Sequence, residues 1–253
     1  MNDRSPDIES ASADYASRFA GRAGEYMLST QSDCVASVLK DYEGGTLLDV
    51  GGGHGQLVGL YESLGINYTV QGSDEACFDF ALSELKPERK IVSDLRQIPQ
   101  KDTSVDVVIA VRLITHLDDW QVVLREMCRV ARKAVVIDYP PRRSLNVLAP
   151  LLFTVKKNIE GNTRTFSNFS RSDFQETFED AGFHTDMSVN QFFFPMVIHR
   201  LLKGRAVSRI IEKLSRMLGL TWALGSPTIL RAVRDDGPMA ESARPGGAVA
   251  REF

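Results

Sequence analysis

The sequence predicts an α/β fold, in which a mostly parallel sheet is covered by helices on both faces. The first observation is residues 46–50, an apolar run that ends in Asp49-Val50 and is typical of a buried parallel strand. The second is the glycine-rich turn that follows this run and leads into a helical pattern at 56–64. The third is the alternation of further short apolar runs with helical patterns, which is typical of strand–helix–strand units. These runs are 68–72, 90–92, 104–109 and 134–137.

Composition sets broad limits on the fold and on the function. A chain of 253 residues with 43% hydrophobic and 25% charged residues suits one sizeable core. The net charge of -3 gives no general attraction to nucleic acid, so we expect no nucleic-acid partner. Cys34, Cys77 and Cys128 are far apart, which argues against a disulfide framework and against a metal site. With no signal pattern at the N-terminus and no long apolar run, we expect a cytoplasmic protein.

Two regions precede the first strand. Residues 1–12 are polar, and we expect them to be frayed. Residues 14–40 then show two helical pieces, broken around Gly21 and Gly24. We therefore predict an N-terminal helical cap over residues 1–45, followed by the main domain over 46–233.

The glycine spacing selects the kind of ligand. A dinucleotide fingerprint needs a glycine three positions after its second one, and a phosphate loop needs a lysine after its last glycine; neither is present. Asp49 stands two positions before the first glycine, in the pattern Asp-x-Gly-x-Gly-x-Gly. A carboxylate there would repel a pyrophosphate but suits a ligand with an ammonium or sulfonium group. A glycine turn with no ligand is the alternative.

The second strand ends at Ser73-Asp74, and the third ends at Asp94-Leu95 after a helix predicted over 76–85. Asp74 lies 23 positions beyond Gly51, close to the ~20 at which an acid meets ribose hydroxyls in nucleotide-binding units. Asp74 could instead cap the following helix, a common role for aspartate.

The fourth strand, 104–109, leads into Val111, Arg112 and then His116. Ligands of open α/β sheets lie outside the carboxyl ends of the strands, so these residues face the expected site. A cation at a strand tip, such as Arg112, could hold an anionic acceptor. Histidine titrates near neutrality, so His116 is either a general base or, the favoured alternative, a residue of a local turn.

The fifth strand is predicted to end at Asp138-Tyr139, after an amphipathic helix at 120–131. Either side chain could orient or deprotonate an acceptor. A sixth strand begins at Phe183, and 226–233 forms the last strand. We expect residues 234–253, which are small and polar, to be disordered.

Two insertions, 142–170 and 191–225, interrupt this pattern, and we expect them to cover the acceptor side of the sheet. The second contains an amphipathic helix whose polar face is basic. Its apolar positions, at three- and four-residue steps, are Val207, Ile210, Ile211, Leu214, Met217 and Leu218. The favoured interpretation is that this apolar face packs on the core; the alternative is peripheral membrane contact through 191–218.

The glycine pattern resembles the first motif of class I S-adenosylmethionine-dependent methyltransferases, of the type 11-like group. The resemblance covers about residues 45–190 and extends to the passage Ile98-Pro99 followed by 104–109. Val105 stands where phenylalanine is usual, and the Pro-Gly-Gly usual before the fifth strand is missing. The resemblance implies a Rossmann-like sheet of seven strands, mostly parallel, with a final antiparallel strand.

The resemblance also implies that S-adenosylmethionine is the cofactor. Asp74 would bind its ribose, Asp94 and Leu95 its adenine, and Tyr15 or Arg18 the carboxylate at its methionine end. The remaining residues expected at the cofactor are Asp49, Gly51, Gly53, Gly55 and Val111.

The expected function is methyl transfer to a small, partly apolar acceptor, with O-methylation of a natural product, sugar or lipid-like molecule favoured by elimination. No motif for another acceptor class is visible, and no metal is indicated. One alternative is a catalytically silent S-adenosylmethionine-binding module that acts through a protein partner. Another is a different nucleotide enzyme such as a dehydrogenase, which the glycine spacing disfavours. The sequence does not define the oligomeric state.

Overall fold

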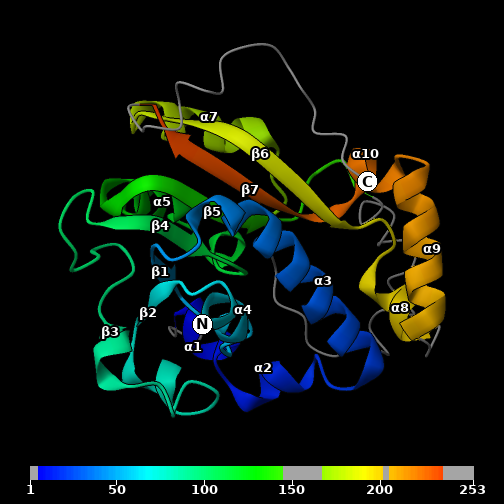
Figure 1. Cartoon of the computed structure of the whole chain (residues 1–253), viewed down its shortest axis with the longest axis horizontal. Helices are drawn as coiled ribbons and strands as arrows, with labels where there is room; N and C mark the ends of the chain where they lie inside the picture. Colours follow the sequence, from blue (N-terminus) through cyan, green and yellow to red (C-terminus); the bar gives the residue numbers. More distant parts are fainter. Residues whose placement is uncertain (1–4, 145–166, 202–204, 236–253) are drawn as a thin grey trace.

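A seven-stranded sheet runs through the computed structural model, which describes residues 5–144, 167–201 and 205–235 (Figure 1). The strand order is β3-β2-β1-β4-β5-β7-β6. The first five strands pair in parallel, and β7 is antiparallel to both of its neighbours. The predicted fold class is therefore confirmed. The strands are β1 (Thr46–Val50), β2 (Asn67–Gly72), β3 (Lys90–Val92), β4 (Val105–Ala110), β5 (Ala131–Tyr139), β6 (Phe183–Phe192) and β7 (Ser226–Arg234).

Helices cover both faces of this sheet. On one face, α3 (Gly21–Leu39) and α4 (Val58–Ser63) pack on alternate residues of β4 and β5 such as Ile109 and Val136. On the other face, α5 (Trp120–Val130) and α7 (Arg171–Asp180) pack on the intervening residues, such as Val108 and Ile137. Since successive strand residues point to opposite faces, a strand buried on both sides must be apolar throughout, as β4 is except at Asp106.

The strand order reverses between β1 and β4, because the chain adds β2 and β3 on one side of β1 and β4 and β5 on the other. At such a point the connections leave the carboxyl ends of neighbouring strands in opposite directions, which opens a ligand site between them. The glycine turn after β1 and the Arg112 segment after β4 both lie here.

Asp106 holds the opposite edge of the sheet together. Its carboxylate accepts hydrogen bonds from the backbone nitrogen and hydroxyl of Thr46, at 3.0 and 2.9 Å, and it pairs with Arg132. Burial raises the pKa of Asp106, but these donors more than offset the effect and hold the pKa below its ordinary value. Asp106 therefore joins the amino ends of β1, β4 and β5, far from the ligand edge.

Two local predictions are wrong. Residues 76–85 form only the short 3₁₀ helix η2 (Glu75–Phe78) and then turns, because the chain folds back to place Leu82 against the glycine turn. Residues 5–12 are not frayed: they contain α1 (Pro6–Ser10), and Asp7 is buried against the segment after β2. The two expected N-terminal helical pieces are α2 (Ala13–Ser17) and α3, and Gly24 lies inside α3.

The second predicted insertion forms α8 (Met196–Leu201), α9 (Arg205–Met217) and α10 (Leu220–Leu224). These helices connect β6 to β7 at the carboxyl edge of the parallel strands, at the right of Figure 1. The expectation that the apolar face of α9 packs on the core is wrong, since Ile210, Leu214 and Met217 are exposed. No helix in the described parts of the chain is long and apolar enough to cross a bilayer.

Several predictions lie outside the described residues. These are most of the insertion 142–170, at 145–166, and nearly all of the tail 234–253, at 236–253. The remaining 3₁₀ helices are η1 (Lys40–Tyr42), η3 (Pro87–Arg89) and η4 (Ile114–His116).

Candidate active site

The glycine turn after β1 adopts a backbone that other residues rarely reach. Gly51, Gly53 and Gly55 have φ angles of 70°, 56° and 71°. A Cβ atom added to Gly52 would lie 2.3 Å from Cγ1 of Val70, so a side chain has no room there either. Gly51 also donates a 2.8 Å backbone hydrogen bond to Gln71, which fixes the turn to β2. The turn thus leaves a stretch of backbone bare of side chains for a ligand to approach.

Asp49 lies beneath this turn. It is buried, and its Oδ2 accepts a 2.9 Å hydrogen bond from the hydroxyl of Tyr61 on α4. Burial raises the pKa of Asp49 to about 7, and the bond from Tyr61 offsets only part of that rise. A nearby ammonium or sulfonium group would favour the ionised form, so the carboxylate suits a cationic ligand.

Asp7 is a site residue that the sequence analysis missed. Its carboxylate accepts hydrogen bonds from the backbone nitrogen and hydroxyl of Ser73, at 2.6 and 2.7 Å. Its Cβ lies 3.4 Å from where a Cβ on Gly51 would stand, so α1 covers the start of the glycine turn. Ser5-Pro6-Asp7 is a helix-start signature that could have revealed α1. No local pattern points to Ser73 as its partner.

Helix α2 and the segment between α2 and α3 bring two aromatic rings to the glycine turn. The ring of Phe19 stacks on His54, the residue between the last two glycines, with centroids 5.6 Å apart. Tyr15 contacts the same imidazole at 5.9 Å. Tyr15 thus lies beside the glycine turn, whereas the Arg18 guanidinium pairs with Glu9 at 3.3 Å. Burial, and then the nearby Arg112 cation, lower the pKa of His54 to about 4, so it stays neutral at physiological pH.

Arg112 completes this group from the tip of β4. Its guanidinium lies over the Phe19 ring, with Cζ 4.1 Å from the centroid. The buried Nη1 makes no hydrogen bond to any of the described residues. Arg112 also has a φ angle of 62°, which is rare for a residue with a side chain. A half-buried cation at the ligand edge, with an Nη1 that binds none of the described residues, is suited to an anionic group.

The strained turn at Arg112 is secured by Asp138 at the tip of β5. The Arg112 backbone nitrogen donates a 2.6 Å hydrogen bond to Asp138 Oδ1. Burial raises the pKa of Asp138 to about 6, while that hydrogen bond and the Arg112 charge act in the opposite direction. Val111, the residue before Arg112, is buried. The tips of β4 and β5 thus hold a carboxyl group whose pKa lies near neutrality.

His116 lies on the same edge of the sheet as Arg112 and Asp138, whereas Tyr139 points away from them. His116 ends η4, in the segment that follows Arg112, so it stays on the ligand edge. Tyr139 follows Asp138 in β5 and therefore points to the opposite face of the sheet. There it packs against Phe174 with ring centroids 5.0 Å apart, and burial raises its pKa to about 12. The geometry brings Asp138 and Arg112 together but does not bring Tyr139 to them.

Asp74 and Asp94 stand at the carboxyl ends of β2 and β3. Asp74 is exposed, and its Oδ1 caps η2 by accepting a 2.9 Å hydrogen bond from the backbone nitrogen of Ala76. The Asp94 side chain is also exposed, and its Oδ1 accepts from the Arg96 backbone nitrogen at 2.9 Å. Leu95 is buried. The capping role considered for Asp74 is present, and it leaves the carboxylate at the solvent edge of the site.

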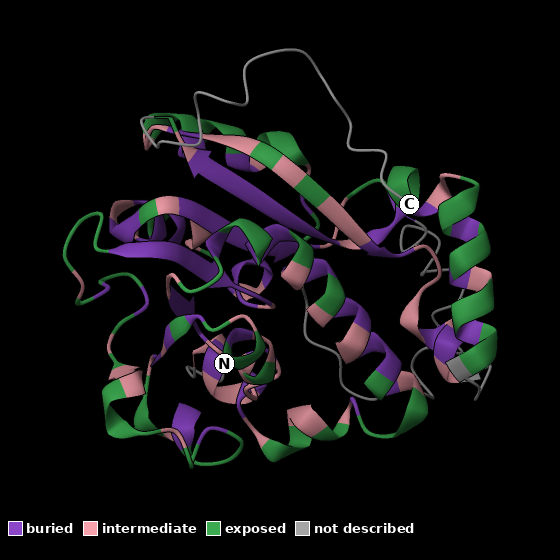
Figure 2. Cartoon of the chain, in the orientation of Figure 1, coloured by how far each residue is buried: buried purple, intermediate pink, exposed green. Residues whose placement is uncertain are grey.

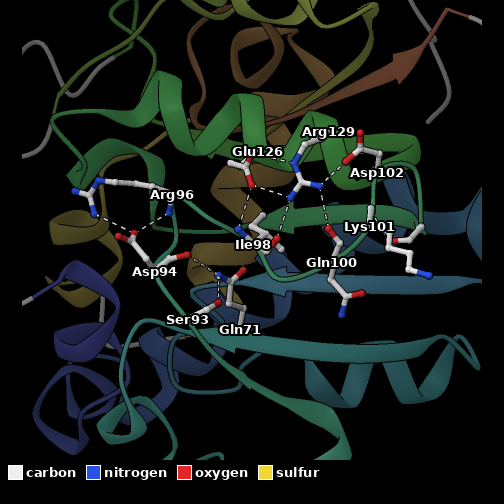
Figure 3. Close-up of polar contacts among 11 residues, drawn as sticks. Gln71, Ser93, Asp94, Arg96, Ile98, Gln100, Lys101, Asp102, Glu126 and Arg129 are labelled. Carbon is white, nitrogen blue, oxygen red and sulfur yellow. Dashed lines mark hydrogen bonds and ion pairs between the residues drawn. The ribbon is translucent and has the colours of Figure 1, made fainter.

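Figure 3 shows how the segment around Asp94 is held in place. Gln71, buried in β2, donates through Nε2 to the Ser93 hydroxyl at 2.9 Å and to the Asp94 carbonyl at 3.3 Å. Farther along, the side chains of Glu126 and Arg129 on α5 bind the backbone nitrogen and carbonyl of Ile98, at 3.1 and 2.9 Å. Both ends of the segment are thus fixed by buried or part-buried hydrogen bonds, which keeps the Asp94-Leu95 backbone in one position.

No group of His, Cys, Asp and Glu residues that could hold a metal ion occurs among the described residues. The three cysteines are free thiols, and all are buried.

Comparisons with known proteins agree with this geometry. Residues 48–137 match the family model described as a methyltransferase domain. No curated protein sequence matches the chain. Among solved structures, a methyltransferase from Thermotoga maritima is 16% identical with a TM-score of 0.60, covering 90% of this chain and 98% of its own. Magnesium protoporphyrin IX methyltransferase from Synechocystis PCC 6803, with bound S-adenosylhomocysteine, is 16% identical with a TM-score of 0.55, covering 84% and 85%. Geranyl diphosphate C-methyltransferase from Streptomyces coelicolor A3(2) is 17% identical with a TM-score of 0.53, covering 80% and 79%.

The residues present fit S-adenosylmethionine. The glycine turn offers backbone without side chains, Asp49 supplies a carboxyl group for a cationic ligand, and Asp74 supplies a carboxylate at the tip of β2. A pyrophosphate is disfavoured for two reasons. The Asp49 carboxylate would repel it, and the glycines do not have the spacing of a dinucleotide-binding turn. The match of residues 48–137 to a methyltransferase domain, together with the strand order, supports a class I S-adenosylmethionine-dependent methyltransferase.

Proposed function

We propose that this enzyme methylates a hydroxyl group of a small, partly apolar acceptor that carries an anionic group, such as a natural product, a sugar derivative or a lipid-like molecule. The observation that carries the proposal is the Arg112 guanidinium, which lies over Phe19 with a buried Nη1 that binds no described residue. A cation beside an aromatic ring attracts a molecule that is apolar in one part and anionic in another.

A small apolar cluster lies at the carboxyl edge of the sheet. Tyr26 and Met27 on α3 pack with Phe192 at the end of β6, and Met196 of α8 packs against this group. These residues belong to the carboxyl edge of the sheet and to the connection between β6 and β7. The names of two similar structures refer to magnesium protoporphyrin IX and geranyl diphosphate, which shows that this fold accommodates small molecules of very different shape.

For the cofactor, we propose that residues 1–45 act as a cap over the main domain, 46–233. Asp74 would hold the ribose, Asp94 and the Leu95 backbone the adenine, and Tyr15 and Arg18 the methionine end. The remaining proposed contacts come from Asp49, Gly51, Gly53, Gly55 and Val111.

In this mechanism, the bound cofactor supplies a methyl group that its sulfonium already activates. The chain contributes orientation of the acceptor and removal of its hydroxyl proton. Asp138 is the favoured base, because burial raises its pKa to about 6 and because it lies beside Arg112. His116 is the second candidate, since it lies on the same edge. Tyr139 has the least support, because it packs on the opposite face.

The first test is calorimetric titration of the purified chain with S-adenosylmethionine and with S-adenosylhomocysteine, where we expect micromolar binding. The second test is a screen of hydroxyl compounds, apolar and anionic ones first, with labelled methyl donor and identification of the product by mass spectrometry. Folded protein that binds neither cofactor would refute the cofactor site. Cofactor binding with no methylated product would favour the silent module, and a product methylated on nitrogen or carbon would refute the hydroxyl acceptor.

A further inference from the structure

Helix α9 buries its polar side and exposes its apolar side, which is the reverse of an ordinary surface helix. The residues it buries are polar and recur at four- and three-residue steps: Ser208, Glu212 and Ser215 are 1%, 2% and 4% exposed. Its apolar side faces outward, with Ile210 59% and Met217 73% exposed. Figure 2 shows the exposed side of α9 at the edge of the molecule. A surface helix normally buries its apolar stripe, so this orientation requires a cause.

Glu212 supplies the cause. Its two carboxylate oxygens accept hydrogen bonds from the backbone nitrogens of Phe193 and Phe194, at 2.9 and 3.0 Å. His199 of α8 lies 3.0 Å from the same carboxylate through Nε2. Rotation of α9 to bury its apolar side would break these contacts and leave the backbone nitrogens of Phe193 and Phe194 without their acceptor, which opposes that rotation.

A second set of hydrogen bonds fixes α9 and α10 to the last residues of β6. Arg216 donates through Nη2 to the Gln191 carbonyl at 2.6 Å. After α9, Asn190 donates to the backbone carbonyls of Thr221 and Trp222, at 3.1 and 2.8 Å, and so fixes α10. The orientation of both helices is therefore built into the fold.

Val207, Ile210, Leu214 and Met217 are exposed and share one side of α9 through their three- and four-residue spacing; together with the exposed Leu218 and Trp222 that follow, we call them the apolar stripe. Its last member, Trp222, is 70% exposed. Contiguous exposed apolar surface marks a site of interaction, and tryptophan is enriched where an apolar phase meets water.

The charges beside the stripe identify the partner. Arg209 and Lys213 are exposed, Arg216 is bound to the Gln191 carbonyl, and the single acid of α9, Glu212, is buried. The exposed charge of the helix is thus wholly positive in a chain whose net charge is -3. A second copy of the chain on this face would bring like charges together, whereas an anionic surface would neutralise them.

We propose that α9 and α10 dock on the surface of an anionic lipid bilayer, with the apolar stripe at the acyl boundary and Arg209 and Lys213 among the headgroups. A helix with an apolar side, a basic flank and an interfacial tryptophan has the composition of such surface-bound helices. Because these helices belong to the carboxyl edge of the sheet, docking brings that edge toward the membrane. The inference goes beyond the proposed activity and does not depend on it.

The test is flotation of the full chain, without cofactor, with vesicles of phosphatidylcholine alone and with vesicles that also contain phosphatidylglycerol. We expect binding to the anionic vesicles only, weakened by added salt. The charge-reversed variant Arg209→Glu/Lys213→Glu should bind at least about tenfold more weakly. The stripe variant Ile210→Ser/Leu214→Ser/Met217→Ser should lose binding. Val122→Ser, which alters a 41% exposed apolar residue on α5, is the matched control and should bind as the parent does.

A second readout reports the depth of Trp222 directly. The chain has two tryptophans, so Trp120→Phe leaves Trp222 as the sole emitter. Its fluorescence should shift to the blue when anionic vesicles are added, and lipids brominated on the acyl chain should quench it. No shift and no flotation would refute the proposal, as would equal binding by the stripe variant, with thermal unfolding used to show that each variant is folded.

Two further outcomes would assign the stripe to another partner and overturn the proposal. The first is a concentration-dependent dimer in analytical ultracentrifugation that the stripe variant abolishes, together with no vesicle binding. The second is equal binding to phosphatidylcholine alone, which would remove the role of the cations.

Discussion

The backbone nitrogen of Arg112 lies 2.6 Å from Oδ1 of Asp138, and this single contact joins the tips of β4 and β5. It secures a residue with a φ angle of 62° and places a guanidinium, whose Nη1 binds no described residue, beside a carboxyl group whose pKa burial raises to about 6. One contact thus sets both the position of the proposed acceptor-binding cation and the environment of the proposed base.

Asp138→Asn tests the base. The amide keeps an oxygen that can accept from the Arg112 nitrogen but cannot take a proton, so turnover should fall by at least ~100-fold while cofactor affinity stays the same. In the parent, turnover should rise as the pH passes about 6, because the carboxylate form is the active one. Full activity in the variant would exclude Asp138 as the base.

His116→Ala tests the competing base. If His116 removes the proton, the variant should lose turnover and keep its affinity for S-adenosylmethionine in calorimetry. If Asp138 does so, His116→Ala should keep most of its activity. Measurement of both variants under the same conditions separates the two roles, and loss of cofactor affinity in either would instead indicate a change in the glycine-turn site.

Asp49 makes the stability of the protein depend on pH. Its pKa in the folded chain is about 7 against an ordinary value of 3.8, so its contribution to stability is complete below that ordinary value and is lost as the pH rises through about 7. Asp49→Asn cannot ionise, and relative to the parent it should gain about 4 kcal/mol of unfolding free energy between about pH 4 and pH 8. Urea unfolding of both proteins across that range is the measurement. A constant difference would contradict the raised pKa.

Tyr61→Phe is the companion variant. It removes the hydroxyl that donates to Asp49, which should raise the Asp49 pKa further and extend the fall in stability to higher pH.

Asp74→Ala should weaken the binding of S-adenosylmethionine by ~1–3 kcal/mol through lost charge-assisted hydrogen bonds. Because Asp74 also caps η2, the alanine variant changes two things at once. Asp74→Asn keeps a capping oxygen and removes the charge, so it isolates the effect on the ligand. Calorimetry on both variants decides: unchanged affinity in both would remove Asp74 from the cofactor site.

Asp7→Ala should destabilise the N-terminal cover. The substitution leaves the Ser73 backbone nitrogen and hydroxyl without their buried acceptor, at a cost of ~1–3 kcal/mol, and should make residues 5–12 sensitive to limited proteolysis. Glu9→Ala is the control on the same helix, since its ion pair with Arg18 is partly exposed and contributes ~0–1 kcal/mol. Equal behaviour of the two variants would show that Asp7 does not anchor α1.

The sheet could be predicted because each strand is marked by a pattern within its own short stretch of sequence. β1, β4 and the core of β5 are mostly apolar runs, and the glycine spacing after β1 limits which class of ligand can bind there. The strand-tip residues followed from the rule that ligands lie at carboxyl ends of strands. The fold class, which depends on these local patterns, is confirmed.

The errors arose where a distant partner decides the structure. Asp7 accepts a hydrogen bond from Ser73, 66 positions away, and no pattern in the polar N-terminal segment predicts that contact. Helix α9 has the amphipathic pattern that was predicted, but Glu212 binds backbone groups near the end of β6 and so reverses which side is buried. Tyr139 and Asp138 looked equivalent as neighbours at a strand tip, although alternation already sends them to opposite faces.

The two edges of the sheet differ sharply in how their connections are built. At the amino edge, α5 ends at Val130 and β5 begins at Ala131 with no residue between them, and α7 reaches β6 through Ala181 and Gly182 alone. At the carboxyl edge, 140–170 join β5 to α7 and 193–225 join β6 to β7. Length can therefore change at one edge without disturbing the register of the sheet. Evolution, or an engineer who exchanges 193–225 between related enzymes, can alter what the protein recognises while the scaffold that binds the cofactor is inherited intact.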